Sequence, residues 1–301
     1  NKLYVALLVL AVVAPFFLYP VFLAKLLCFA LFACAFNLML GYVGLLSFGH
    51  AAFLGTGGYI TGWLMMNSGL TPELAILLGT VAAGALGAIF GKLSVKREGI
   101  YFAMVTLALA QLVFFIYLQA PFTGGEDGMQ GVPRGNLFGV IDLSDNMNMY
   151  YFVLAVFLFG FWLIHRTIHS PFGQVLKAIR ENEARAVSLG YNVNDYKWVA
   201  FTISAALAGL AGSIEVLGVT AGVTTTMSPG FGYAGIVVAM LAALHPAGVV
   251  AAAVFVATVF VGADAMSRAT GVPSFIADVV VALSLLTMIV ALLFTTYRVR
   301  R

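Results

Sequence analysis

The stretch SPFGQVLKAIRENEARAVSLGY, from Ser170 to Tyr191, is polar and charged, whereas the chain on both sides of it is apolar over membrane-spanning lengths. Ser170 is a favourable N-cap, Pro171 suits the first helical position, and Gly190 suits the end of a helix. The pattern predicts one short helix that begins at Ser170 and ends near Gly190.

The predicted helix is amphipathic. Val175, Ile179 and Val187 fall on a similar helical face. The charged residues are spread over the other faces: Lys177, Arg180, Glu181, Glu183 and Arg185. A helix of this kind between two apolar blocks must lie outside the bilayer, in contact with water, lipid headgroups or a partner protein.

The composition indicates a membrane protein. The 301 residues are 62% hydrophobic and 9% charged, whereas soluble domains have about 25% charged residues. This length has room for about ten spans of roughly 20 residues each. The 32 glycines suit helices that pack closely in lipid. We therefore predict an all-α integral membrane protein with one membrane domain over residues 1–301, and the net charge of +3 is too small to indicate a nucleic-acid partner.

Ten apolar segments are the predicted spans. They are Leu3–Tyr19, Val21–Leu40, a segment that ends near Asn67, Pro72–Lys92, Ile100–Leu118, Met149–Ile168, Lys197–Val219, a short Gly232–Leu244, Val249–Ala265 and Phe275–Tyr297. A polar loop, 119–148, and the charged segment, 169–195, lie outside the spans.

Positive charge predicts the orientation. With ten spans, most basic residues fall on one side: Lys96, Arg97, Arg166, Lys177, Arg180, Arg185, Lys197 and the C-terminal arginines. Arg134 and Arg268 fall on the other side. The side richer in Lys and Arg is cytoplasmic. We expect both termini and the charged helix to be cytoplasmic, and the loop 119–148 to be external.

The sequence contains a weak internal repeat. GIYFAMVTLALAQL (Gly99–Leu112) and VPSFIADVVVALSL (Val272–Leu285) are 272 − 99 = 173 residues apart. An offset of five spans predicts two inverted repeats, as in many transporters. The alternative is that apolar segments resemble one another by composition alone.

No motif predicts catalysis. Gly230–Gly235 matches G-x-G-x-x-G, but it lies among membrane segments without a strand–helix unit. Cys28 and Cys34 share one apolar segment and the histidines are scattered, so we predict no metal site. We expect a chain that is not an enzyme and binds no cofactor, so any ATP would be bound by a separate subunit.

Polar but uncharged residues in the apolar half are candidates for a translocation path. These are Asn37, Ser47, His50 and Gln111. An uncharged lining suits repeated binding and release, while hydrogen bonding between helices is the alternative role. The carboxylates Glu215, Asp264 and Asp278 lie toward span ends, and we interpret them as interfacial anchors.

Four blocks of sequence together resemble a known family. They are GYVGLLSFGHAAFLGTGGY (41–59), GIYFAMVTLALAQL (99–112), TGGEDGMQGVP (123–133), and the stretch from Ser170 to Ser213. In this order they resemble the LivM-type permeases of branched-chain amino-acid ABC importers. The resemblance implies a ten-span permease in the bacterial inner membrane. It also implies a LivH-like second permease, two ATPase subunits that bind ATP and Mg, and an external solute-binding protein as partners.

The resemblance also implies roles for two polar segments. The charged helix is similar to the coupling helix that sits in a groove of the ATPase, with Ser170, Pro171, Phe172, Gly173, Arg180, Glu181, Glu183, Arg185 and Gly190 as its residues. The external loop, with Gly125, Glu126 and Asp127, would face the binding protein.

The last third departs from the LivM pattern. GIVVAMLAALHPAGV (235–249) is more similar to the permeases of nucleoside and simple-sugar ABC importers. Hydrophobic amino acids are the expected substrate, with nucleosides, simple sugars and urea or short amides as alternatives. A secondary transporter or a solute channel is the alternative from another class, but the chain shows no mid-span carboxylate for ion coupling and carries a charged helix that a channel would not need.

Overall fold

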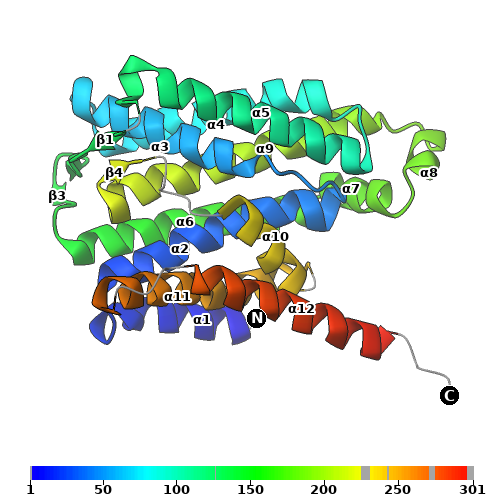
Figure 1. Cartoon of the computed structure of the whole chain (residues 1–301). Helices are drawn as coiled ribbons and strands as arrows, with labels where there is room; N and C mark the ends of the chain where they lie inside the picture. The colour runs from blue at the N-terminus through cyan, green and yellow to red at the C-terminus, as the bar shows by residue number, and fades with distance from the viewer. Residues whose placement is uncertain (1, 126, 225–230, 243, 271–274, 297–301) are drawn as a thin grey trace.

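A computed structural model describes residues 2–125, 127–224, 231–242, 244–270 and 275–296. Within this part the chain is a bundle of helices (Figure 1). The helices are α1 (Lys2–Val13), α2 (Pro20–Asn37), α3 (His50–Asn67), α4 (Pro72–Ser94), α5 (Gly99–Gln119), α6 (Asn146–Ile168), α7 (Pro171–Glu181), α8 (Glu183–Ser188), α9 (Val193–Glu215), α10 (Phe231–Leu241), α11 (Pro246–Thr270) and α12 (Ile276–Thr296).

Six of the described helical segments are long and apolar enough to cross a membrane. They are Pro20–Val43, Pro72–Ser94, Gly99–Gln119, Asn146–Ile168, Val193–Thr220 and Gly248–Thr270. The class of all-α membrane protein is therefore confirmed, but the count of about ten spans is not. The first predicted span is interrupted, because α1 has 12 residues and gives way at Ala14–Phe16 to a 3-10 turn that contains Pro15. Twelve helical residues extend only about 18 Å.

The long central helices α2 and α9 end in the same unusual way. Each continues as a π-helix, Leu38–Val43 after α2 and Val216–Thr220 after α9. The π-helices are followed by residues with left-handed backbone, Gly44 with φ 80° and Ala221 with φ 48°. The π-helix after α2 matters for the site, because the charged segment packs against it.

Glycines bring α3, α4 and α9 into close contact. A Cβ atom on Gly57 of α3 would overlap the backbone of Gly209 in α9, and one on Gly212 would overlap the carbonyl oxygen of Leu54. A Cβ atom on Gly87 of α4 would overlap the side chain of Ala205. Small residues let helix backbones approach in lipid, so these contacts form the rigid centre of the bundle.

We expect Gly57→Val to destabilise the protein strongly. The side chain would meet backbone atoms of Gly209, which cannot move aside as a flexible side chain would. Overpacking of a well-packed core typically costs about 1–3 kcal/mol, and occasionally more. Thermal melting of the protein in detergent measures the effect. Gly262→Val is the control, because a Cβ atom on Gly262 meets nothing within 4 Å. Equal melting temperatures for the two variants would show that the glycine contact is not needed.

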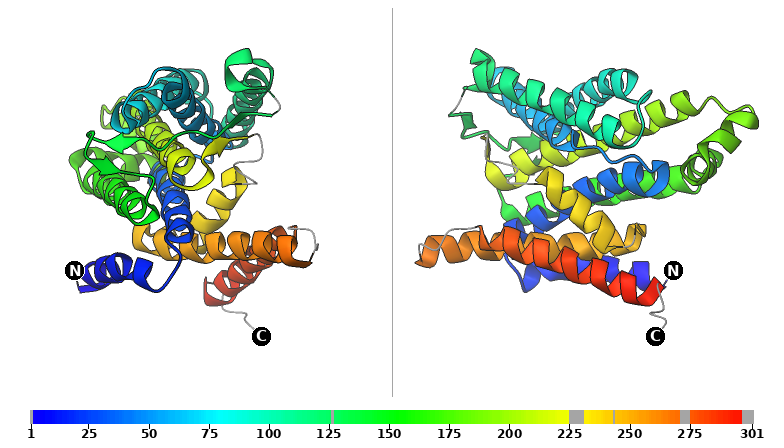
Figure 2. Two further views of the ribbon diagram at one scale, coloured as in Figure 1. Left: turned by 90° about the vertical axis from the view of Figure 1, so that its left-hand side faces the viewer. Right: turned by 45° about the vertical axis from the view of Figure 1, so that its right-hand side comes forward.

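The two ends of the bundle differ. Figures 1 and 2 show α7 and α8 at one end, together with the last turns of α2, α4 and α6 and the start of α9. The other end carries two short ribbons, β1 (Met129–Gln130) paired with β4 (Gly222–Val223), and β2 (Asn136–Leu137) paired with β3 (Ile141–Asp142), all antiparallel. The predicted charged segment and the predicted polar loop thus lie at opposite ends.

The segment 170–191 forms two helices, so the prediction of a single helix is wrong. The break is at Asn182, whose backbone is extended with φ −158° and ψ 97°. Its side-chain oxygen accepts a hydrogen bond from the Arg185 backbone N–H at 2.9 Å and caps α8. Asparagine competes well for this role because its side chain replaces the backbone partner that a new helix start lacks.

The predicted helix ends are confirmed. The Ser170 hydroxyl accepts from the Gly173 backbone N–H at 3.3 Å, and Gly190 adopts a left-handed φ of 88° after α8. The predicted apolar face is correct for Ile179, which is 3% exposed, and wrong for Val187, which is 57% exposed. The break at Asn182 changes the helical phase between these two residues and turns Val187 outward.

Candidate translocation pocket and coupling surface

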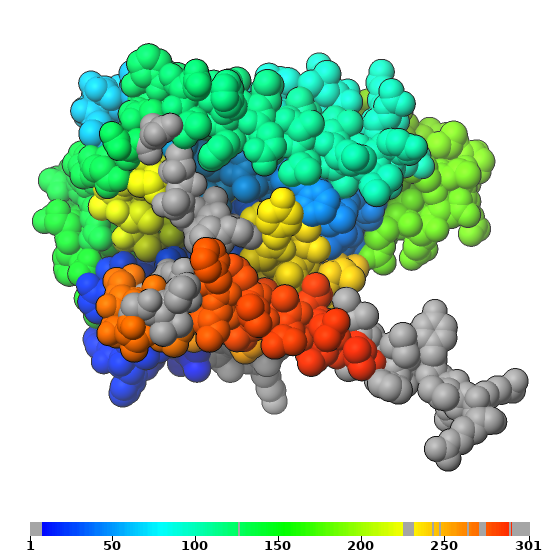
Figure 3. Space-filling model, in the orientation of Figure 1, coloured from blue at the N-terminus to red at the C-terminus, as the bar shows by residue number. Residues whose placement is uncertain are grey.

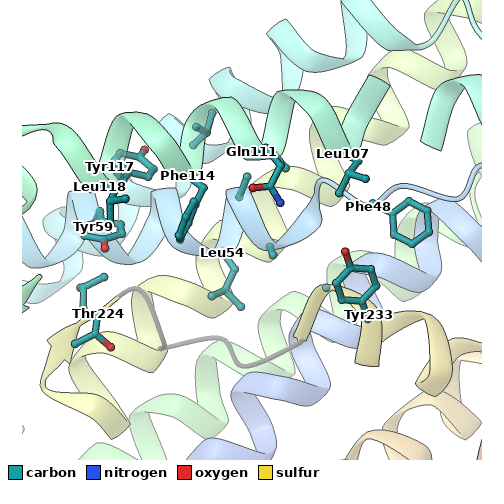
Figure 4. A pocket seen from close by; sticks show the side chains of 17 residues that line it. Phe48, Leu54, Tyr59, Leu107, Gln111, Phe114, Tyr117, Leu118, Thr224 and Tyr233 are labelled. Atoms are coloured by element: carbon teal, nitrogen blue, oxygen red, sulfur yellow. The ribbon is translucent and has the colours of Figure 1, made fainter. Parts of the chain in front are cut away.

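A cavity of about 200 Å³ lies between α3 and α5. Figure 3 shows the hollow between α5 and α10 on the surface, and Figure 4 shows its lining. The labelled residues are Phe48, Leu54 and Tyr59 from α3 and the loop before it, Leu107, Gln111, Phe114, Tyr117 and Leu118 from α5, Thr224 directly after β4, and Tyr233 from α10. The cavity is therefore built from segments far apart in the sequence.

The lining is mostly apolar, and its hydroxyl groups are partly used within the protein. The rings of Tyr59 and Tyr117 stack with centroids 4.8 Å apart. The Tyr117 hydroxyl donates to the Thr56 hydroxyl at 3.0 Å, and Thr56 donates in turn to the Ala52 carbonyl at 2.7 Å. None of the described lining residues is charged. This wall suits a neutral group that is largely apolar.

The structure separates the four residues that were predicted to line a path. Gln111 lines the cavity. Asn37, Ser47 and His50 do not, and each is at most 2% exposed. The Asn37 amide donates to the Leu244 carbonyl at 3.3 Å, and the Ser47 hydroxyl accepts from the Gly49 backbone N–H at 3.2 Å. Only His50 makes the hydrogen bond between helices that the alternative interpretation described, to Ser204. A part in the path stays a prediction for all three.

His50 belongs to a buried network between α2, α3 and α9. Its Nε2 lies 2.8 Å from the Ser204 hydroxyl, which itself donates to the Ala35 carbonyl at 2.6 Å. Because that hydroxyl proton is already used, His50 must carry its proton on Nε2 and donate it to Ser204. The edges of Phe36, Phe53 and Phe201 surround the imidazole. His50 therefore fixes how three helices meet.

Two of the acidic residues that were interpreted as interfacial anchors lie in different surroundings. Glu215 is 1% exposed at the end of α9, so it is enclosed by the bundle, and its part as an interfacial anchor stays a prediction. Asp278 in the first turn of α12 is exposed. Burial of Glu215 could not be inferred from its position near a span end, because it depends on how α9 packs in the centre of the bundle.

The coupling surface, defined as α7 and α8, is clamped to the end of α2. The Arg180 guanidinium donates to the carbonyl oxygen of Gly41 in the π-helix. Lys177 Nζ lies 5.6 Å from the ring centre of Tyr42, which is a favourable cation–π distance. A Cβ atom on Gly44 would lie 2.7 Å from Cγ of Arg180, so the left-handed glycine also leaves room for this contact. Movement of α7 would thus be passed to α2.

A second clamp ties α8 to α9. Lys197 is 2% exposed, and its Nζ lies 2.6 Å from Oε2 of Glu183. Ile179, Ala186 and Val193 form a small apolar cluster beside this ion pair. Glu183 therefore acts within the chain and positions α8.

The outer face of the coupling surface remains uncovered. Its exposed residues include the predicted Glu181 and Arg185 and the large apolar Val187, which is 57% exposed. Directly after α8, Leu189 and Tyr191 are 68% and 40% exposed. Of the other predicted coupling residues, Ser170, Phe172 and Gly173 lie in the first turn of α7, where Phe172 stacks on Tyr196 at 5.4 Å. Pro171 is the first residue of α7 and is exposed. The sequence pattern did not mark Leu189 or Tyr191, although apolar residues next to a helix-ending glycine were a usable signal.

We expect Glu183→Gln to lower the melting temperature of the protein, because it leaves buried Lys197 without its counter-charge. Since the Glu183 side chain is 33% exposed, water screens part of the loss and about 1–3 kcal/mol remains. Glu181→Gln, the same change on an exposed carboxylate, is the control. Adding Lys197→Met to Glu183→Gln should restore stability. Equal melting temperatures for Glu183→Gln and Glu181→Gln would show that the Lys197–Glu183 ion pair does not stabilise the protein.

The polar loop 119–148 is tied to the bundle at several points. The Arg134 guanidinium donates to Oδ1 of Asn146 at 2.8 Å and to the Gly218 carbonyl at 3.3 Å. Of the residues predicted to face a binding protein, Gly125 has a left-handed φ of 63°, Asp127 is exposed, and Glu126 lies outside the described residues. Ser144 donates its backbone N–H to Asp142 and thereby lowers the pKa of that carboxyl. The loop is an ordered surface at the end opposite α7.

Comparisons with known proteins agree with this architecture. The E. coli (strain K12) high-affinity branched-chain amino acid transport system permease protein LivM is 32% identical over 241 residues, which is 71% of this chain and 57% of that protein. The Salmonella typhimurium LivM is 30% identical with the same coverage. The glucose ABC transporter permease protein TsgB13 of Haloferax volcanii is 26% identical over 275 residues, 85% of this chain and 72% of that protein.

The chain thus spans a little over half the length of the two LivM proteins. No solved structure matches it significantly. The family described as the permease component of the branched-chain amino acid transport system matches residues 20–292, which include the described helices from α2 through most of α12. The chain therefore belongs to the family of permease components of branched-chain amino acid transport systems.

Proposed function

We propose that this chain is the permease subunit of an ABC importer in the bacterial inner membrane and translocates hydrophobic branched-chain amino acids. The observation that carries the proposal is the coupling surface, α7 and α8, which is clamped to α2 and α9 and leaves an apolar and charged outer face uncovered. An ATPase subunit that moved this surface would move two central helices. ATP and Mg belong to that subunit, and this chain itself binds no cofactor.

The end with α7 is the proposed cytoplasmic end. Lys96, Arg166 and Lys177 lie there with most of the other basic residues, whereas Arg134 lies in the loop at the other end. The positive-inside rule supports this orientation. Both termini would then be cytoplasmic, and the last turn of α12 lies toward the α7 end in Figure 1, which supports this for the C-terminal side.

Two inverted repeats and about ten spans remain part of the proposal. The element order supports the repeat: α9 begins 193 − 20 = 173 residues after α2, α11 begins 246 − 72 = 174 after α4, and α12 begins 276 − 99 = 177 after α5. Helices α2 and α9, which both end in a π-helix, run in opposite directions (Figure 1). Opposite directions at an offset of five spans are what an axis in the membrane plane produces.

The proposed partners follow from the uncovered surfaces. A pair of ATPase subunits would receive the coupling surface, and an external binding protein would dock on the loop that holds Gly125 and Asp127. Helix α5, of which only 22% of the span is buried, would pack against a LivH-like second permease. That subunit would close the open side of the cavity.

The cavity favours an amino acid with an apolar side chain as the substrate. Its wall offers few free polar groups, whereas a sugar would leave several hydroxyl groups without partners. Branched-chain amino acids are also what the names of the LivM relatives state. A simple sugar is the second candidate, because the Haloferax relative is named a glucose permease and matches more of this chain.

Translocation would take three steps. The loaded binding protein docks on the external loop and releases its ligand toward the cavity. ATP-driven closure of the ATPase pair then pushes the coupling surface, and the Arg180 and Glu183 clamps pass the movement to α2 and α9. The spans swing, and the cavity opens toward the cytoplasm.

Competition for uptake tests the substrate. Cells that express the importer with its own binding protein should take up labelled leucine, and excess isoleucine or valine should reduce that uptake at least about tenfold. Excess glucose, uridine or urea should leave it unchanged. Uptake of labelled glucose that leucine does not reduce would replace the amino-acid proposal with the sugar one.

A further inference from the structure

A second hollow lies at the α7 end of the bundle, between the last turn of α4 and the first turns of α9. It has a volume of about 260 Å³, and its lining includes Lys92, Lys96 and Trp198. It shares no lining residue with the cavity between α3 and α5. None of its residues belongs to the coupling surface, so the proposed function leaves it unexplained.

The hollow is built around a fixed indole. The Trp198 Nε1–H donates to the Ala88 carbonyl at 2.8 Å, which holds the ring against α4. A Cβ atom on Gly91 would lie 2.8 Å from Cδ1 of Trp198, so this glycine allows the close approach. Lys92 Nζ lies 5.4 Å from the ring centre and is held near the hollow by the cation–π contact.

The charge of the hollow is positive. Lys92 and Lys96 both face it and are exposed. One carboxylate, Asp195, also lies on its rim, where its Oδ2 accepts from the Asn192 amide at 2.6 Å. Two lysines against one carboxylate leave a net positive site that suits an anion.

Large apolar residues close in sequence to the two lysines are exposed. On α4, Ile89 and Leu93 are 58% and 59% exposed, and at the start of α5, Ile100 and Tyr101 are 71% and 70% exposed. A water-soluble anion gains nothing from such a surface, whereas the acyl chains of a lipid would cover it. Tyrosine and tryptophan at this level are also typical of the border between headgroups and hydrocarbon.

We propose that this hollow binds the phosphate headgroup of an anionic phospholipid of the inner leaflet. Lys92 and Lys96 would contact the phosphate, and the acyl chains would lie along α4. Basic pockets between membrane helices on the cytoplasmic side are known to bind such headgroups. The proposal rests on the proposed orientation of the chain but not on the transported substrate. Failure of the lipid site can therefore be distinguished from failure of the proposed transport function.

Native mass spectrometry of the complete importer, taken from nanodiscs of mixed phosphatidylglycerol and phosphatidylcholine, tests the site. We expect phosphatidylglycerol to be retained in preference to phosphatidylcholine. Lys92→Gln and Lys96→Gln should each lower that retention about fivefold, since each lysine near an anionic surface contributes about 1 kcal/mol. Lys96→Arg should preserve the retention of phosphatidylglycerol. Arg268→Gln, which removes one exposed charge in the last turn of α11, away from the hollow, should leave the retention unchanged.

Three results would overturn the proposal. The first is equal retention of the two lipids by the wild-type protein. The second is a loss in Arg268→Gln as large as that in the lysine variants. The third is displacement of phosphatidylglycerol by millimolar inorganic phosphate, which would identify a site for the free anion. Uptake assays on the same variants separate the lipid site from the transport function. Loss of phosphatidylglycerol retention with intact leucine uptake supports the lipid site and leaves the proposed function in place.

Discussion

Glu181→Lys is expected to reduce ATP-driven uptake about 10- to 100-fold while the permease still inserts and assembles. Glu181 is the last residue of α7, it is exposed, and it forms no ion pair with another residue that the structure describes. Reversal of its charge therefore leaves the two clamps of the coupling surface intact. It changes only what a docked ATPase would meet, and like charges across an interface cost several kcal/mol.

The measurement is uptake of labelled leucine at equal amounts of membrane-inserted protein. Glu98→Lys is the matched control, because it makes the same charge change on an exposed residue at the same end but outside α7 and α8. Wild-type uptake in Glu181→Lys would remove Glu181 from the proposed interface. Equal losses in both variants would show a general effect of charge at this end.

Gly55→Trp is expected to abolish uptake, with a loss of at least about 100-fold. Gly55 lines the cavity, and a Cβ atom at this position meets nothing within 4 Å, so the side chain can enter the cavity without moving α3. An indole would fill much of a space of about 200 Å³. The substrate would then have no room against the wall formed by Leu54 and Phe114.

The assay pairs uptake with thermal melting and with the basal ATPase activity of the complex. Melting and basal ATPase activity should stay near wild type, because none of the clamp residues lines the filled cavity. Gly262→Trp on α11 is the control, since a Cβ atom there also meets open space. Uptake that survives in Gly55→Trp would show that the substrate does not pass through this cavity.

The sequence predicted the long helices well where apolar runs are bounded by strong signals. Pro20, Pro72 and Gly99 begin α2, α4 and α5 at or within one residue of the predicted bounds. The capping residue Ser170 was equally clear. The sequence could not predict the break at Asn182, because an asparagine within a charged stretch either continues a helix or caps a new one. Tertiary contacts such as the Lys197–Glu183 ion pair decide between these outcomes.

The candidate site was predicted only in part. A polar residue in an apolar span has the same pattern whether it lines a path, as Gln111 lines the cavity, or is buried between helices, as His50 is. Arg180 and Glu183 were expected to face the ATPase, and the structure shows both engaged in contacts within the chain. Whether Arg180 or Glu183 also contacts a partner depends on how α7 and α8 pack against the bundle, which the sequence pattern alone does not determine.

Leucine uptake into proteoliposomes that contain this permease and the partner subunits purified with it tests whether ATP hydrolysis drives transport. One set holds the complete complex with its binding protein and ATP, and a second set lacks only the ATPase subunits. Uptake that occurs in the first set and falls to the background of empty liposomes in the second is the predicted result. Uptake that persists without the ATPase subunits would contradict the importer and identify a channel or a secondary transporter.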